Sequence, residues 1–191
     1  MQESGLISLA IFYYDFTQDG KKNVSGFLSS VLTQLCNQSY SYYGILFDLY
    51  STHHNRGQSP GDDKLFEYLI KILKCPGARP VYLIIDALDE CPSSSSLSSP
   101  REKLLSFLED LVEAQLPNLH ICATSRPEVD IKALLEPLAF RSVSLHNEGG
   151  QKQDIIKCIV SFVSTNKNMQ NWNPEHKQLV IDVLTEKADG M

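Results

Sequence analysis

The stretch Val81–Cys91, which reads V-Y-L-I-I-D-A-L-D-E-C, decides the fold of this chain. Its first five residues are apolar without interruption, and they directly follow Pro80. A continuous apolar run of this length predicts a strand buried on both faces, as in parallel sheets that are covered by helices. Asp86 ends the run, and ligands of open α/β sheets bind beyond the carboxyl ends of the strands.

Three carboxylates follow this strand within five residues: Asp86, Asp89 and Glu90. An unpaired ionised carboxylate is costly to bury, so we expect Asp86 at the tip of the strand, facing a cleft. A hard cation such as Mg²⁺, held largely through water, matches this concentration of negative charge. The stretch therefore predicts a metal and ligand site at this edge of the sheet.

A second apolar strand lies within Leu119–Pro127, L-H-I-C-A-T-S-R-P, and runs into Thr124, Ser125 and Arg126. Together the two stretches resemble the NACHT family of P-loop NTPases. D-A-L-D-E looks like the Walker B segment, and the strand that ends before Arg126 looks like the sensor 1 strand. The pair is similar to the nephrocystin-3-like N-terminal modules of fungal signalling proteins (STAND class), and the resemblance extends to Met191.

This resemblance implies a site that binds Mg²⁺ and hydrolyses ATP or GTP. Asp86 would hold the Mg²⁺ through water. Asp89 and Glu90 are the candidates for orienting or deprotonating the attacking water, with Glu90 slightly favoured. Arg126 would contact the terminal phosphate of the nucleotide, both as a cofactor-binding and as a catalytic residue.

The phosphate loop of that family, G-x-x-x-x-G-K-[ST], is absent from these 191 residues. Gly20-Lys21 is the only Gly-Lys pair, with Asp15 where the first glycine should stand and Lys22 where Ser or Thr should stand. Without the loop, the phosphates lack a backbone cradle and a lysine, and Mg²⁺ lacks a hydroxyl ligand. We expect a NACHT module that begins after its phosphate loop and does not turn over ATP alone, which leaves open whether the chain is an enzyme.

Alternating strands and helices predict an α/β fold with a parallel three-layer sheet. The resemblance implies an incomplete P-loop NTPase core at residues 1–148, with the Walker B and sensor 1 strands but no phosphate loop. Residues 149–191 would begin a C-terminal helical domain. The expected strands are Leu6–Phe16, Val81–Ile85, the strand of Leu119–Pro127 that ends in Thr124, Ser125 and Arg126, and Phe140–Leu145. The expected helices are Val24–Cys36, Ser39–Tyr50, Asp63–Lys74, Arg101–Gln115, a helix ended by Pro137, Gln151–Asn166 and a last helix from Asn173-Pro174.

The composition limits the classes of partner and the cellular compartment that we expect for this chain. The net charge of −6 does not suggest a nucleic-acid-binding face. No stretch reaches the roughly 18 apolar residues of a membrane span, and no secretory signal is visible. The five cysteines are scattered and odd in number, which favours reduced thiols. We expect a cytoplasmic protein whose partners are proteins, with no nucleic acid and no membrane.

Two functions of different classes remain. The first is a NACHT-type signalling NTPase whose nucleotide state governs oligomerisation, with its phosphate loop supplied by upstream sequence. The second is a non-catalytic interaction module or decoy, which associates with itself or with full-length NACHT relatives. A Cys91 nucleophile with His120 or His146 as its base is disfavoured, because two carboxylates precede the thiol and oppose its ionisation.

We predict that the 191-residue chain is only marginally stable. In the family, the phosphate-loop strand lies between the sensor strand and the last strand, so its absence unpairs the backbone of both neighbours. Each unpaired buried backbone group costs about 1–3 kcal/mol, against a total stability of about 5–15 kcal/mol. Thermal unfolding followed by circular dichroism should have its midpoint below about 60 °C, and a cooperative transition above that temperature would contradict this prediction.

Overall fold

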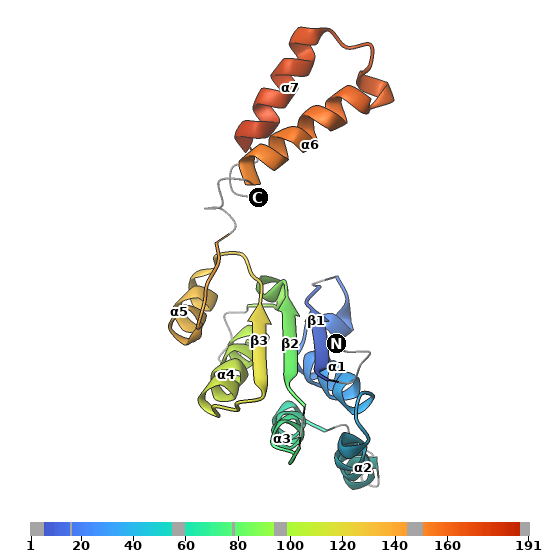
Figure 1. Cartoon of the computed structure of the whole chain (residues 1–191), viewed down its shortest axis with the longest axis vertical. Coiled ribbons are helices and arrows are strands. Elements are labelled where there is room, and N and C mark those ends of the chain that lie inside the picture. The colour runs from blue at the N-terminus through green and yellow to red at the C-terminus, as the bar shows by residue number, and fades with distance from the viewer. Residues whose placement is uncertain are drawn as a thin grey trace. The chain divides into compact units, whose positions relative to one another are not determined.

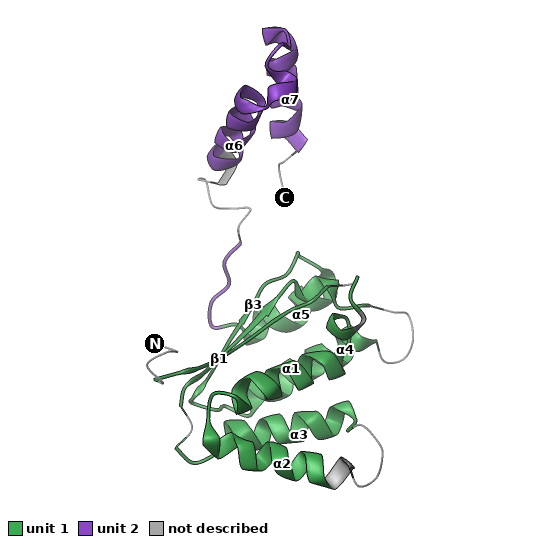
Figure 2. Ribbon diagram, turned by 90° about the vertical axis from the view of Figure 1, so that its right-hand side faces the viewer, with its two compact units in different colours: residues 1–139 green, residues 140–191 purple. Residues whose placement is uncertain are grey.

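The computed structural model describes residues 6–15, 17–54, 60–77, 79–93, 99–144 and 151–187. Within these residues the chain has a mixed α/β fold and divides into two units, residues 1–139 and 140–191 (Figure 2). The first unit contains a parallel sheet with helices packed against it, and the second contains two helices that pack on each other.

The sheet has three parallel strands in the order β1-β2-β3 (Figure 1). These are β1 (Ser8–Tyr13), β2 (Val81–Asp86) and β3 (Leu119–Ala123). Tyr13 lies opposite Asp86 in the register, and Ile85 lies opposite Ala123, so the three carboxyl ends are level. The structure confirms the strands expected in these three regions, with β2 at the centre of the sheet.

Five helices accompany the sheet among the described residues of the first unit. They are α1 (Val24–Cys36), α2 (Tyr40–His54), α3 (Asp62–Leu73), α4 (Pro100–Glu113) and α5 (Val129–Leu138). Asn23 caps α1, as its side chain accepts a hydrogen bond from the Gly26 N–H at 2.7 Å. Pro137 lies inside the last turn of α5 and does not end the helix before itself.

Within the described residues of the first unit, helices cover one face of the sheet, which corrects two expectations from the sequence. Ala10, Phe12, Leu83 and Ile85 share the buried face and form one core with α1, α3 and α4. On the opposite face, Ile11, Tyr13 and Tyr82 are between 40% and 48% exposed. The prediction that β2 is buried on both faces was therefore wrong within the first unit, because no helix among its described residues covers that face. For the same reason, the described residues of the first unit form two layers rather than the expected three.

The outer edge of β1 is closed by two glutamine side chains. The Gln34 amide accepts from the Ile11 N–H at 3.0 Å and donates to the Ile11 carbonyl at 2.8 Å. The Gln38 amide accepts from the Leu9 N–H at 2.9 Å and donates to the Leu9 carbonyl at 2.7 Å. Each side-chain amide thus takes the place of a peptide group in a further strand, and this protects an edge that could otherwise pair with another chain.

The second unit contains α6 (Gln151–Thr165), the short turn η4 (Lys167–Met169) and α7 (Pro174–Lys187). The strand expected at Phe140–Leu145 was wrong for residues 140–144, which have no regular structure and are exposed. Only Phe140 and Val143 are apolar in this stretch, so pairing it with the sheet would bury little surface. Leu145, and the expected boundary at 148/149, lie outside the described residues. No helix in the described part of the chain has the length and apolar character to cross a membrane.

We predict that Gln38→Glu lowers the free energy of unfolding by about 1–3 kcal/mol. The substitution keeps the shape of the side chain but replaces the amide donor, which serves the Leu9 and Gln34 carbonyls, with a carboxylate oxygen. Urea unfolding of the two proteins measures the difference. Gln115→Glu, the same change at an exposed side chain, is the control. Equal stability of the two variants would show that the glutamine clamp on β1 contributes nothing.

Candidate functional site

The candidate site lies at the level carboxyl ends of β2 and β3. Asp86 is the last residue of β2, and Asp89 and Glu90 lie in the short 3-10 turn η2 (Leu88–Glu90) that follows. Arg126 lies three residues beyond β3. The structure thus brings all four residues predicted from the sequence to one edge of the sheet.

Thr124 holds the turn after β2. Its hydroxyl donates to the Asp86 carboxylate and accepts from the Ala87 N–H at 3.1 Å. Its backbone N–H donates to the Ile85 carbonyl at 2.9 Å, and its carbonyl accepts from the Leu88 N–H at 3.0 Å. Ala87 has a φ of 52°, a left-handed conformation that costs a residue with a Cβ about 1–2 kcal/mol. These bonds offset that strain and fix the direction of the Asp86 carboxylate.

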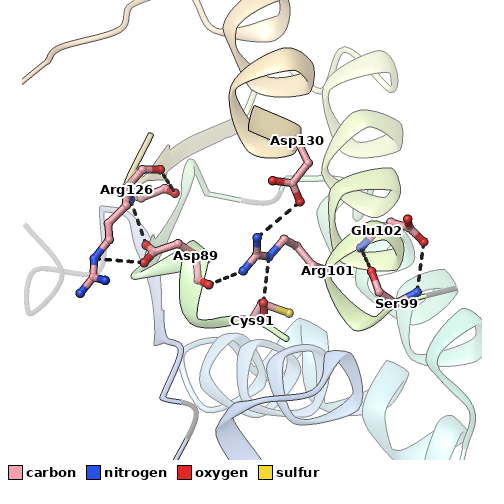
Figure 3. A network of polar contacts seen from close by, with 8 residues as sticks. Asp89, Cys91, Ser99, Arg101, Glu102, Arg126 and Asp130 are labelled. Carbon is pink, nitrogen blue, oxygen red and sulfur yellow. Dashed lines mark hydrogen bonds and ion pairs between the residues drawn. The ribbon is translucent and has the colours of Figure 1, made fainter. Parts of the chain in front are cut away.

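Asp89 faces Arg126 (Figure 3). The Arg126 N–H donates to Asp89 Oδ1 at 3.0 Å, and Arg126 Nε lies 3.5 Å from Asp89 Oδ2. The Asp89 side chain is 10% exposed, whereas the Arg126 side chain is 80% exposed. The ion pair itself therefore contributes little to stability. The hydrogen bond from the Arg126 backbone N–H, however, fixes the position of the Arg126 backbone beside Asp89. This geometry gives Asp89 a holding role toward the backbone of Arg126.

Arg101 is a site residue that the sequence reasoning missed. It is the second residue of α4 and only 8% exposed. Its Nε donates to the Cys91 carbonyl at 2.8 Å, its Nη2 donates to the Asp89 carbonyl, and its Nη1 lies 3.4 Å from Asp130 Oδ2 (Figure 3). A signal was available in the sequence, because Arg101 shares the helical spacing of the apolar positions Leu104, Leu105 and Leu108.

The donor set at Asp86 suits one kind of metal ion. No group of three or more His, Cys, Asp and Glu side chains that could hold a metal was found in the described part of the chain. Asp86 instead offers one exposed carboxylate beside the hydroxyl of Thr124. This fits Mg²⁺, which keeps several waters and takes other ligands from phosphates. It does not supply the four protein ligands of a structural zinc site.

The Cys91 thiol is not placed to act as a nucleophile. It is fully buried, and burial raises its pKa to about 11, although the nearby Arg101 charge acts in the opposite direction. The thiolate is the reactive form, so this cysteine is inert near neutral pH. His120 stacks on Tyr82 at a centroid distance of 4.6 Å, and His146 lies outside the described residues.

Comparison with known families places this geometry in context. The family model described as Nephrocystin 3, N-terminal, matches residues 1–126, which is 126 of the 191 residues. The chain belongs to this nephrocystin 3 N-terminal family. The nephrocystin 3 N-terminal match contains all three strands and ends at Arg126, so it includes every site residue named above except Asp130. Searches of the curated proteins and of the solved structures gave no match.

We predict that Thr124→Val destabilises the protein by about 1 kcal/mol. The substitution preserves the branched shape but removes the hydroxyl that joins Asp86 to the Ala87 N–H. Urea unfolding measures the stability, and hydrogen exchange at the Ala87 amide reports the local effect. Thr33→Val is the matched control, since the Thr33 hydroxyl bonds only within its own helix, to the Ser29 carbonyl at 2.8 Å. If Thr124→Val and Thr33→Val have the same stability and the same exchange rate at the Ala87 amide, the Thr124 hydroxyl does not hold the turn after β2.

We also predict selective alkylation of the cysteines by iodoacetamide at about pH 8. Cys122 and Cys158 are exposed and should react. Cys36 and Cys91 are buried, and burial raises the pKa of both thiols to about 11, so their thiolates are scarce at that pH. Mass spectrometry of peptides locates the label, and the denatured protein, in which every cysteine should react, is the control. If Cys91 is labelled as fast as Cys122 in the native protein, the conclusion that the Cys91 thiol is buried and inert would be refuted.

Proposed function

We propose that the chain carries the metal-binding and water-activating half of a NACHT-type NTPase site, within a nucleotide-dependent signalling switch. The supporting observation is the meeting of Asp86, Asp89, Glu90 and Arg126 at the carboxyl ends of two adjacent parallel strands. Ligands of open α/β sheets bind at this edge. Membership of the nephrocystin 3 N-terminal family agrees with this proposal.

Each residue has a distinct role in the proposed site. Asp86 holds Mg²⁺ through water beside the Thr124 hydroxyl, and the ion supplies neutralisation of the phosphate charge of ATP or GTP. Glu90 orients or deprotonates the attacking water. Arg126, whose side chain extends into solvent, contacts the terminal phosphate, and Asp89 holds that arginine in place.

The phosphate-binding half of the site is not encoded in these 191 residues, which contain no G-x-x-x-x-G-K-[ST] loop. The residues present place charge around the metal and the terminal phosphate but do not cradle the phosphate chain. We therefore propose that the chain does not hydrolyse nucleotide alone. Its partners would be proteins of the cytoplasm, among them copies of itself or NACHT relatives.

A second candidate function is a non-catalytic interaction module. The open face of the sheet favours it, because Ile11, Tyr13 and Tyr82 expose apolar surface there. Contiguous exposed apolar surface often marks a site of protein association. This function requires no metal at Asp86, so a test of the metal site separates the two candidates.

We predict that Mn²⁺, used as a paramagnetic substitute for Mg²⁺, binds at Asp86. In ¹H–¹⁵N NMR spectra of the full chain, Mn²⁺ should broaden the amide signals around Asp86 and Thr124, and added Mg²⁺ should reverse the effect. Asp86→Asn should abolish the broadening, because it removes the ligand charge. Asp110→Asn, at an exposed carboxylate on α4, should leave it unchanged. Broadening around Thr124 that persists in Asp86→Asn would refute the proposed metal site.

A further inference from the structure

Asp89, Arg101, Arg126 and Asp130 lie beside the candidate site, where polar contacts and the chain between Arg126 and Asp130 link them into a ring (Figure 3). The Asp89 carboxylate binds Arg126 after β3. Four residues beyond Arg126, Asp130 lies in the first turn of α5 and pairs with Arg101 at 3.4 Å. Arg101 then donates to the backbone carbonyl of Asp89, which closes the ring. The ring connects the acidic turn after β2, the loop after β3 and the start of α4.

The Arg101 side chain is only 10% exposed, and this position of a cation needs an explanation. A cation in the first turn of a helix opposes the helix dipole, and a buried charge is costly unless its hydrogen bonds are made. The guanidinium meets this requirement with the Cys91 carbonyl, the Asp89 carbonyl and the Asp130 carboxylate. Its planar fork places several donors at fixed angles, which the single ammonium of lysine cannot do.

The backbone around Arg101 is anchored independently of its side chain. Ser99 Oγ accepts from the Glu102 N–H at 3.1 Å, and Glu102 Oε2 accepts from the Ser99 N–H at 3.1 Å. This capping box fixes the start of α4. The Arg101 N–H also donates to the Pro92 carbonyl at 3.2 Å. The guanidinium therefore extends from a fixed base toward the acidic turn.

We propose that Arg101 is a positioning residue that couples the acidic turn after β2 to the arginine loop after β3. Its bond to the Asp89 carbonyl sets where the Asp89 carboxylate lies, and that carboxylate holds the backbone of Arg126. Its pairing with Asp130 fixes the start of α5, just beyond Arg126. The inference rests on the proposed function, since it assigns the position of the arginine proposed to contact the terminal phosphate.

The backbone amide of Arg126 provides a readout specific to this role. An N–H that donates to a carboxylate has a downfield proton signal and exchanges slowly with solvent. In NMR spectra of the full chain, Asp89→Ala defines the signal when this bond is lost. Arg101→Gln should move the Arg126 amide signal toward that value and raise its exchange rate about tenfold, because a charge-assisted bond is lost.

Lys103→Gln is the matched control. Lys103 lies on the same helix and carries the same charge, but it pairs with Asp62 and Asp63, outside the ring. Its substitution should leave the Arg126 amide unchanged. If Arg101→Gln does not fold, Arg101→Lys keeps the charge and the aliphatic stem without the fork, and should shift the amide in the same direction by a smaller amount.

An Arg126 amide that is unchanged in folded Arg101→Gln would overturn the proposal, even if the thermal midpoint fell, because Arg101 would then only stabilise the fold. If Arg101→Gln does not fold, an unchanged Arg126 amide signal in Arg101→Lys would overturn the proposal. The signal is read without metal or nucleotide. Failure of Mn²⁺ to bind at Asp86 would therefore refute the proposed function without affecting this result.

Discussion

The hydroxyl of Thr124 makes the interaction on which the candidate site depends. It connects the Asp86 carboxylate to the Ala87 N–H across the ends of two strands. Ala87 must adopt a left-handed conformation for the chain to turn immediately after β2, and the bonds to Thr124 stabilise that turn. Because the turn is tight, Asp89 and Glu90 follow Asp86 at the same edge of the sheet. The acidic cluster is thus held by Thr124, the residue that follows β3, and not by its own sequence alone.

The two faces of the sheet differ in how they are packed. One face packs against α1, α3 and α4, and the outer edge of β1 is closed by Gln34 and Gln38. The other face is open among the described residues of the first unit. Parallel sheets are normally covered on both faces, so the open face of the first unit departs from that rule. The site at the strand ends does not require the open face to be covered, since its contacts come from β2, β3, α4 and α5.

Local patterns predicted much of this fold because their physical causes are local. The apolar runs of β2 and β3, the Asn23 cap and the helical spacing of α1, α3 and α4 all depend on neighbouring residues. The exposure of Tyr82 could not be predicted, because it depends on which helices cover the sheet. The prediction of a strand at Phe140–Leu145 was wrong for residues 140–144. Alternation of apolar and polar residues does not by itself supply a neighbouring strand to pair with. The helical spacing of Arg101 with Leu104 and Leu108 indicated a buried position but not its partners, since two are backbone carbonyls and the third is the distant Asp130.

The central claim is that these residues form one half of a nucleotide site, with the phosphate-binding half not encoded among them. Hydrolysis of ATP by the 191-residue chain in the presence of Mg²⁺, compared with that of Asp86→Asn, tests this claim most directly. Neither protein should release phosphate above the buffer background, because nothing among these residues cradles the phosphate chain. Hydrolysis by the natural sequence that disappears in Asp86→Asn would contradict the account, since a complete site would then lie within these residues.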